Sequence, residues 1–259
     1  MSSPLLTQVG ALAQRSVVRT ARQPASAIPP LVFPVLLLLV NSGGLKASTL
    51  LPGFPTDSFL AFALAVPFIQ GALFSMVNAG TDLARDIQTG FFSRLSLTPV
   101  RGSALLAGQI TGIVVLGIVQ AVFYISVGLV LGVRFAAGPA GIALLLVYAA
   151  LVAIAFGGLG SFLALRLGSS ESIQGLFPAL FVFLFISSMN TPRDLIAVSW
   201  FRFLATINPV SYLIECVRSL IITGWDTRAL VLGFGFATLI AIASLGAASW
   251  ALGRRMERT

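Results

Sequence analysis

The feature that most constrains this chain is a series of long segments without a charged residue. Six such segments, of 21 to 32 residues, lie between charged side chains: 23–45, 58–81, 102–133, 135–165, 172–192 and 229–253. A run of about 18 apolar residues is long enough to cross the hydrocarbon core of a bilayer as a helix. Only 9% of the residues are charged, whereas a soluble domain carries about 25%. The sequence therefore predicts an all-α integral membrane protein with six transmembrane helices, and it excludes a soluble enzyme.

The composition also excludes several kinds of chemistry. The sequence contains no histidine, so catalytic triads, metal sites and proton relays that need this residue are excluded. Its single cysteine, Cys216, has no partner for an intrachain disulfide. Lys46, the one lysine, lies between Leu45 and Ala47, which excludes a GxxxxGK[ST] phosphate loop. We expect no catalytic residue, no metal site and no bound cofactor in this chain. If ATP powers the protein, another polypeptide binds it.

The distribution of basic residues predicts the orientation in the membrane. With six spans both termini lie on one side, and the Lys/Arg excess marks the cytoplasmic side. The segments on the side of the termini carry 10 basic residues and the other segments carry 6, with four acidic residues on each side. Both termini are therefore predicted to be cytoplasmic. The arginines stand at span ends rather than in a block, so topology accounts for the net charge of +8 without a nucleic-acid partner. No cleavage of a signal peptide is expected.

Residues 1–24 are predicted to form an amphipathic helix in the membrane interface, ahead of a six-span domain at 25–259. Leu6 and Val9 belong to an apolar face with helical spacing, while Arg15 and Arg19 lie on a different face. Such a helix can lie among lipid head groups with its arginines towards phosphate and water. The alternative is a poorly ordered basic tail.

Small residues four positions apart predict close packing between spans. They form the pairs Gly108 and Gly112, Gly128 and Gly132, and Gly157 and Ser161. Small side chains let helix backbones approach closely where the hydrophobic effect no longer drives association. Packing within one subunit is the expected meaning, and a dimer contact is the alternative.

The segment between spans two and three has an amphipathic pattern. Leu83, Ile87, Phe91 and Leu95 recur at four-residue spacing and give an apolar strip. Thr98 followed by proline resembles a helix cap that restarts a helix into span three. Such a segment can insert its strip into a groove of a partner protein. The alternative is an ordinary connector in the interface.

The segment between spans five and six contains an apolar stretch, residues 203–214, that is too short to cross the membrane. It fits a re-entrant or interfacial element. Asn208 can cap, and Pro209 can open, a short helix there. Glu215 and Arg218 stand three residues apart on that helix, so they are expected to neutralise each other, because an unpaired charge at membrane depth is costly. Direct contact with a substrate is the equal alternative.

Both segments resemble those of ABC-2 type exporter permeases, most closely the daunorubicin-resistance type. The first shows an acidic residue, a glycine and a Pro-x-Arg ending, and many members carry Glu where this chain has Gln88. The resemblance implies a cytoplasmic coupling helix between spans two and three, with ATPase coupling through Arg85, Asp86, Gln88, Gly90, Arg94, Leu95, Pro99 and Arg101. The second segment matches the family's outer re-entrant motif at Asn208, Pro209, Tyr212, Glu215 and Arg218.

This resemblance implies a permease subunit of an ATP-driven exporter in the bacterial cytoplasmic membrane. Such a permease pairs with a second permease copy and with two cytoplasmic ABC ATPase subunits, which bind ATP and Mg. Nucleotide binding there would move the coupling segment and switch the spans between inward-open and outward-open states.

The cargo is predicted from the polar and aromatic residues inside the spans. These polar groups are few and uncharged, and aromatic residues accompany them, which suits a hydrophobic or amphipathic cargo such as a drug or a lipid-like molecule. Candidate pathway residues are Gln70, Asn78, Phe181, Phe185 and Ser187. The alternative is that the phenylalanines face lipid or neighbouring helices. A lipid-linked glycan exporter of the same superfamily also stays open.

Two other classes are less compatible with the sequence. An ion-coupled secondary transporter usually needs ionisable groups near the membrane centre, and no charged residue falls within a predicted span core. A membrane enzyme needs positioned acids, bases or metal ligands. The outer carboxylates Asp194, Glu215 and Asp226 show no metal-like clustering in the sequence.

Overall fold

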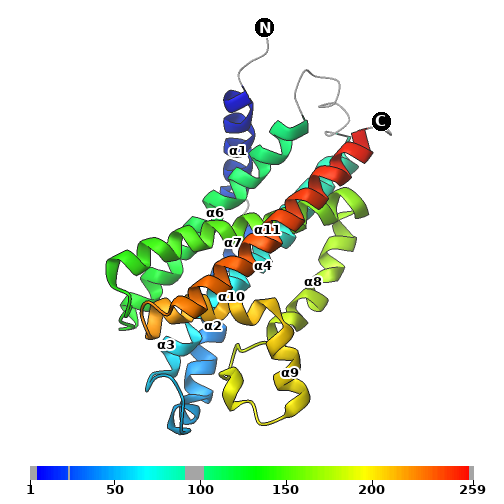
Figure 1. The fold of residues 1–259 in the computed structure, drawn as a ribbon. Coiled ribbons are helices and arrows are strands. Elements are labelled where there is room, and N and C mark those ends of the chain that lie inside the picture. Colours follow the sequence, from blue (N-terminus) through cyan, green and yellow to red (C-terminus); the bar gives the residue numbers. More distant parts are fainter. Residues whose placement is uncertain (1–4, 23, 91–101, 257–259) are drawn as a thin grey trace.

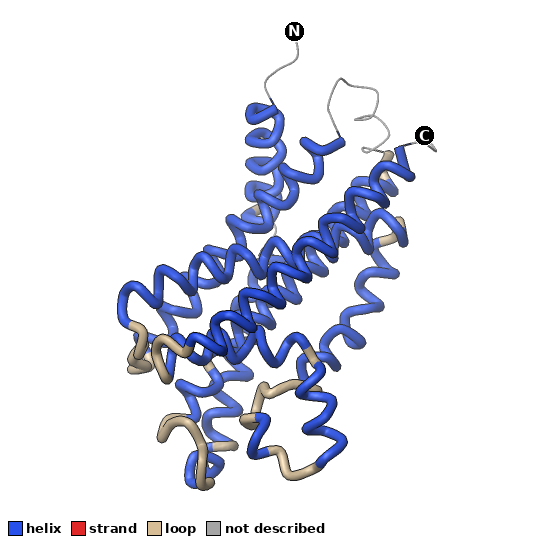
Figure 2. The backbone as a smooth tube through the Cα atoms, viewed as in Figure 1, coloured by secondary structure: helices blue, strands red, loops and turns tan. Residues whose placement is uncertain are grey.

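The computed structural model describes residues 5–22, 24–90 and 102–256, and every regular element in these residues is a helix (Figures 1 and 2). The prediction of an all-α fold is confirmed. The elements are α1 (Leu5–Ala21), α2 (Pro24–Gly44), η1 (Lys46–Leu50), α3 (Phe59–Ala63), α4 (Ala65–Gln88), α6 (Gly102–Val130), α7 (Gly138–Leu167), α8 (Ser170–Phe185), η2 (Arg193–Leu195), α9 (Ser199–Ile207), α10 (Pro209–Ile222) and α11 (Thr227–Met256).

Within the described residues, four helices are long and apolar enough to cross a membrane. They are Phe59–Gln88, which joins α3 and α4, Leu106–Val130, Gly138–Leu167 and Thr227–Arg255. The bent pair of α9 and α10 would make a fifth. The helices at the expected first and fifth spans, α2 and α8, are apolar but shorter.

The uncharged segment 172–192 extends beyond the end of the helix that it forms. Helix α8 ends at Phe185, and the chain from 186 to 192 is irregular. The absence of charge alone did not reveal this end, because the residues that follow are uncharged but polar, among them Ser187, Ser188 and Asn190.

Helix α7 lies at the centre of the molecule and packs against α4, α6 and α11 (Figure 1). Its small residues make each of these contacts close. A Cβ atom at Gly160 would collide with the Met76 carbonyl of α4, and one at Gly158 would collide with Ser244 of α11. At Gly157 the obstacle is Ile113 of α6. Small residues in this helix therefore serve packing within one subunit, as predicted.

Helix α2 contains three prolines, Pro29, Pro30 and Pro34, yet continues to Gly44. Pro34 has no N–H, so it cannot bond the carbonyl of Pro30 one turn earlier. The buried hydroxyl of Tyr124 on α6 donates to that carbonyl instead. An unpaired carbonyl in an apolar environment is costly, and this bond therefore fixes α2 against α6.

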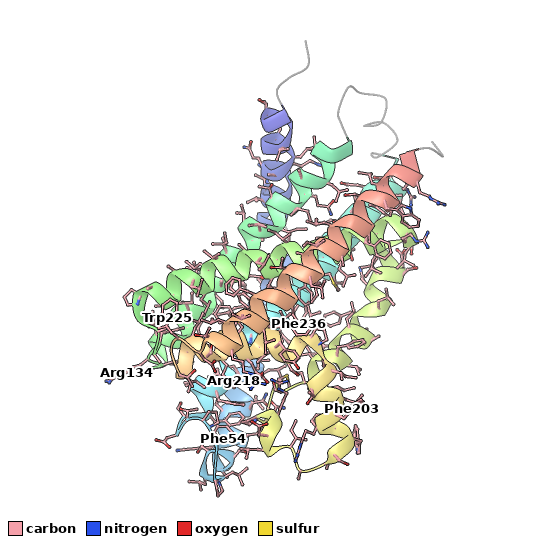
Figure 3. All side chains as sticks on the ribbon, in the orientation of Figure 1. Phe54, Arg134, Phe203, Arg218, Trp225 and Phe236 are labelled. Atoms are coloured by element: carbon pink, nitrogen blue, oxygen red, sulfur yellow. The ribbon has the colours of Figure 1, made fainter. Side chains whose placement is uncertain are left out.

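The described parts of the two motif-bearing segments lie at opposite ends of the bundle (Figure 1). One end, here named the α1 end, gathers α1, the end of α4, the start of α8 and the last turns of α11. The other, named the α9 end, gathers η1, α9 and the start of α10. Figure 3 shows Arg218 among the helices towards the α9 end, whereas Arg134 projects from the periphery.

Candidate functional site

At the α1 end, the last turn of α4 is bound by helix α1. Arg15 of α1 places Nη2 3.0 Å from both carboxylate oxygens of Asp86. Leu12 and the Val9 carbonyl lie so close to Gly108 of α6 that a Cβ there would collide with Leu12. Helix α1 is thus held along α6 and tied to α4. Asp86 thus has a partner on another helix, 71 positions earlier in the chain.

Helix α8 binds the same turn of α4 through Gln88. The Ser170 hydroxyl donates to Gln88 Oε1 at 3.1 Å, and Gln88 Nε2 donates to Glu171 Oε2 at 3.3 Å. A glutamate at position 88 would face a second carboxylate. The amide that departs from the family pattern both donates and accepts here, so it joins the two helix ends.

Gly90 ends this turn in the left-handed conformation, with φ +70°. It follows the C-cap residue Thr89, the position where helices commonly place glycine. A Cβ at this position would meet no atom within 4 Å, so a substitution would cause backbone strain rather than a collision. Arg85 lies exposed on the same turn. The remaining expected coupling residues, together with the coupling helix that carries them, lie outside the described residues: Arg94, Leu95, Pro99 and Arg101.

At the α9 end, Asn208 connects three helices. Helices α9 and α10 meet at a bend of 79°. Asn208 Oδ1 accepts from the Val210 N–H at 2.9 Å, and Pro209 is the first residue of α10, so the predicted cap is confirmed. The Asn208 amide also donates to the carbonyls of Phe183 and Ile186 at the end of α8. One side chain therefore caps the start of α10 and the end of α8.

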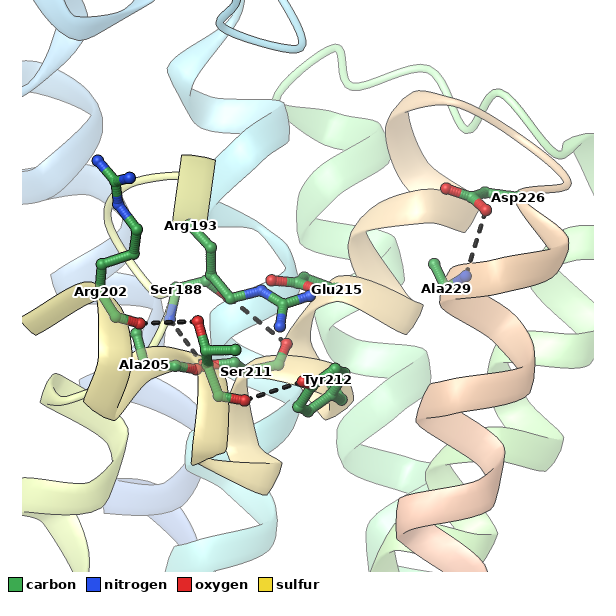
Figure 4. A network of polar contacts seen from close by, with 10 residues as sticks. Ser188, Arg193, Arg202, Ala205, Ser211, Tyr212, Glu215, Asp226 and Ala229 are labelled. Carbon is green, nitrogen blue, oxygen red and sulfur yellow. Dashed lines mark hydrogen bonds and ion pairs between the residues drawn. The ribbon is translucent and has the colours of Figure 1, made fainter. Parts of the chain in front are cut away.

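The first turn of α10 satisfies the last carbonyls of α9, which have no partner within their own helix. Ser211 donates to the Ala205 carbonyl at 2.6 Å, and the Tyr212 hydroxyl donates to the Thr206 carbonyl at 2.8 Å (Figure 4). The Ser188 N–H donates in turn to Ser211 Oγ at 3.1 Å. Ser211 was missed from the sequence, although a hydroxyl three residues after a capping asparagine was the available signal.

The expected pairing of Glu215 with Arg218 is wrong. Glu215 binds Arg193 of η2, with Nη2 2.6 Å from Oε2 (Figure 4). The Arg193 guanidinium also lies 4.4 Å from the centre of the Tyr212 ring. Arg218 makes its hydrogen bonds to other groups.

Arg218 is only 7% exposed and is held by backbone carbonyls. Its Nε donates to Phe62 O at 3.2 Å and its Nη2 to Met189 O at 3.1 Å. Its guanidinium carbon lies 3.5 Å from the centre of the Phe62 ring. Phe62 stands in the last turn of α3, where carbonyls need partners from outside the helix. Arg218 therefore joins α3, α10 and the chain after α8.

The expected pathway residues do not all come together. Phe181 of α8 joins Phe33 of α2, Phe74 of α4 and Phe177 of α8 in a cluster with ring centres 5.0 to 6.1 Å apart. We name the contact zone of these three helices the α2–α4–α8 seam.

The remaining candidates differ in burial. Gln70 is buried on α4 and Asn78 is half-buried on the same helix. Phe185 is 51% exposed, and its ring centre lies 5.6 Å from that of Phe181, so the structure brings these two candidates together. Ser187 is buried with its hydroxyl donating to the Leu184 carbonyl. The structure thus places Ser187 within the chain's own turn, not in a shared site with Gln70.

Comparison with known proteins decides the family. The model of the family described as ABC-2 type transporter matches residues 7–222. The chain belongs to the ABC-2 type transporter family. The match covers both motif-bearing segments and ends at the last residue of α10.

Curated relatives of this ABC-2 protein are permeases. The daunorubicin resistance ABC transporter permease protein DrrB1 of Streptomyces coeruleorubidus is 28% identical over 219 residues, covering 80% of this chain and 72% of that protein. The transport permease ycf38 of Porphyra purpurea is 26% identical over 224 residues, covering 84% and 75%. The chain is accordingly a multi-pass membrane subunit of an ABC transporter.

Proposed function

We propose that this ABC-2 permease is the membrane subunit of an exporter that moves a hydrophobic or amphipathic molecule, a drug or a lipid-like compound, across the bacterial cytoplasmic membrane. The observation that carries the proposal is the convergence of α1 and α8 on the last turn of α4, through Arg15 and Gln88. That turn leads directly into the segment 91–101. A displacement of this segment would be passed to three helices at once.

The proposed topology has six spans: α2, α3 with α4, α6, α7, α8 and α11. Helix α1 lies in the cytoplasmic interface, both termini are cytoplasmic, and the pair α9 and α10 forms a re-entrant outer element. The short helices α2 and α8 fit a span because a bilayer thins, and flanking residues extend to the interface, at a cost of a fraction of a kcal/mol per Å of mismatch.

Energy in this proposal comes from separate ABC ATPase subunits, which bind ATP and Mg and dock on the segment after Gly90. Their closure moves the end of α4. The Arg15–Asp86 pair then transmits the movement to α1, and Gln88 transmits it to α8. A second permease copy completes the transporter.

The proposed cargo route follows the α2–α4–α8 seam. Its lining is aromatic and uncharged, which suits apolar or amphipathic molecules. Helix α8 is connected to the coupling turn at one end and to Asn208 at the other. Movement of α8 away from α4 would open the seam along its length. The name of the Streptomyces relative, daunorubicin resistance, supports a drug as the cargo class.

Co-purification tests the docking role. The tagged permease is expressed together with the ABC ATPases of its source genome. We expect the ATPase to co-purify with the natural chain and to be lost from the combined variant Gly90→Val and Arg94→Glu. Arg134→Glu, a charge reversal at the exposed periphery of the α9 end (Figure 3), is the matched control and should retain it. Failure of the natural chain to retain any ATPase, or equal retention by the docking variant, would contradict the proposal.

A further inference from the structure

Three buried side-chain atoms without a hydrogen-bond partner lie on one helix, α4. Among the residues that the structure describes, they are Gln70 Oε1, Gln70 Nε2 and Thr81 Oγ1. Gln70 is 1% exposed and Thr81 is 8% exposed. Leaving a buried amide or hydroxyl group unpaired costs about 1–3 kcal/mol. A cost of this size indicates a partner that the neighbouring helices do not supply.

Both residues lie on the same face of α4. Positions 70, 74, 77 and 81 follow the spacing of three and four residues that defines one side of a helix. Phe74, between them, contacts Phe33 of α2 and Phe177 of α8. Gln70 and Thr81 therefore flank the aromatic cluster of the α2–α4–α8 seam, separated by about 16 Å along the helix axis.

The charges around the seam select against an anionic cargo. Helix α2, helix α8 after Glu171 and helix α4 before Asp82 carry no charged residue. Asp82 and Glu171 stand at the α1 end of α4 and α8, where a hydrogen bond joins the two helices. Within the seam itself a phosphate group would meet no cation, and an unpaired charge at membrane depth is expensive.

We propose that Thr81 and Gln70 are two successive hydrogen-bonding positions for cargo, and that the cargo class is an uncharged, ring-containing amphiphile with hydroxyl or carbonyl groups. Its rings pack on Phe74 and Phe177 while its polar groups bind first the Thr81 hydroxyl and then the Gln70 amide. The proposal rests on the proposed function, because it takes the seam as the cargo route. It excludes lipid-linked phosphate head groups from that route.

Equilibrium binding tests the proposal without any ATPase, so its result is separable from the co-purification result. The full-length permease in phosphatidylcholine nanodiscs is titrated with 2-naphthol, 2-methylnaphthalene and 2-naphthyl phosphate, and empty nanodiscs are subtracted. We expect saturable binding of 2-naphthol and at least tenfold weaker binding of the phosphate. Gln70→Leu should weaken the binding of 2-naphthol about three- to tenfold, which is the contribution of one neutral hydrogen bond. It should leave the binding of 2-methylnaphthalene unchanged.

Gln120→Leu is the matched control, because this glutamine of α6 already accepts a hydrogen bond from Ser75 at 3.1 Å. It should leave 2-naphthol binding unchanged. Equal binding of 2-naphthol by the natural chain and Gln70→Leu would overturn the proposal, as would binding of the phosphate as tight as that of 2-naphthol. An equal loss in Gln120→Leu would also overturn it.

Thermal unfolding provides an independent readout. Replacing a glutamine that forms structural hydrogen bonds lowers the stability of the protein, whereas replacing an unpaired glutamine does not. We expect Gln70→Leu and the isosteric Thr81→Val to keep or raise the Tm, by about 2 °C for a gain near 1 kcal/mol. A lower Tm in both variants would show that these side chains stabilise the fold, and would overturn the proposal.

Discussion

The α9–α10 junction and the α2–α4–α8 seam are both polar features of an apolar protein, and they treat their polar groups in opposite ways. At the junction, Asn208, Ser211 and Tyr212 bond helix-end backbone groups. In the seam, Gln70 and Thr81 are buried without a bond. The first arrangement lowers the free energy of the folded chain, and the second raises it.

The difference shows how to separate structural polar residues from functional ones in a membrane protein. A bilayer offers no water to backbone groups, so each bend needs side chains that replace the missing partners. The 79° bend between α9 and α10 is such a place. An unpaired side chain within a span, by contrast, has no backbone role. Substitutions in the two regions are therefore expected to move stability in opposite directions.

The largest expected effect is at Asn208. Asn208→Ala removes the cap of Val210 and the donors to two carbonyls at the end of α8, so we expect a loss of about 3 kcal/mol at about 1 kcal/mol for each bond. Thermal unfolding in detergent measures it. Asn208→Asp keeps the capping oxygen but turns an acceptor oxygen towards the carbonyls of Phe183 and Ile186, so it should lose at least as much as Asn208→Ala. A Tm equal to that of the natural chain would remove the contrast with the seam.

Arg218 gives the next largest effect. Arg218→Met keeps much of the volume but leaves the carbonyls of Phe62 and Met189 unpaired, and we expect a loss of about 2 kcal/mol. The same type of change at Gln70, polar to apolar at a buried position, should cost nothing. Comparing the two unfolding curves tests whether hydrogen bonding, rather than burial, decides if the substitution lowers the stability of the protein. Equal losses at both positions would refute this distinction.

The Arg193–Glu215 pair is expected to contribute less. Its side chains are 22% and 23% exposed, so solvent screens the pair and we expect a coupling of about 1 kcal/mol in a double-mutant cycle of Arg193→Gln and Glu215→Gln. If the effects of the two substitutions on stability are additive, the coupling energy is zero and the salt bridge itself does not stabilise the fold.

The smallest effect on stability is expected at the α1 end. Arg15 and Asp86 have side chains 40% and 19% exposed, so each neutralisation should cost no more than about 0.5 kcal/mol and the cost should fall with added salt. The charge exchange Arg15→Asp with Asp86→Arg should restore the natural Tm. A loss above about 2 kcal/mol would exceed the range of an exposed pair and make this contact a structural one like the junction.

Local signals in the sequence predicted much of this fold. Long uncharged runs predicted the helices, and Asn208 followed by Pro209 predicted the start of α10, because span length and capping depend on neighbouring residues alone. The end of α8 was not predicted, since its carbonyls are capped by a residue 22 to 25 positions away.

The partners of charged groups were predicted less well for the same reason. Glu215 has Arg218 on its own helix, but the packing of the bundle places Arg193 against Glu215. Arg218 instead donates hydrogen bonds to two backbone carbonyls. Asp86 binds Arg15 from a helix 71 positions earlier. Spacing identifies which residues share a face, whereas the choice of partner follows from how the helices pack.

ATP-driven transport tests the central claim, that a separate motor powers this permease, most directly. Proteoliposomes containing the permease and its partner ATPase are given a fluorescent, uncharged amphiphile. We predict uphill accumulation that requires ATP and the ATPase and that persists when ionophores collapse proton and sodium gradients. Uphill accumulation by the permease alone, driven by an ion gradient without ATP, would contradict the claim.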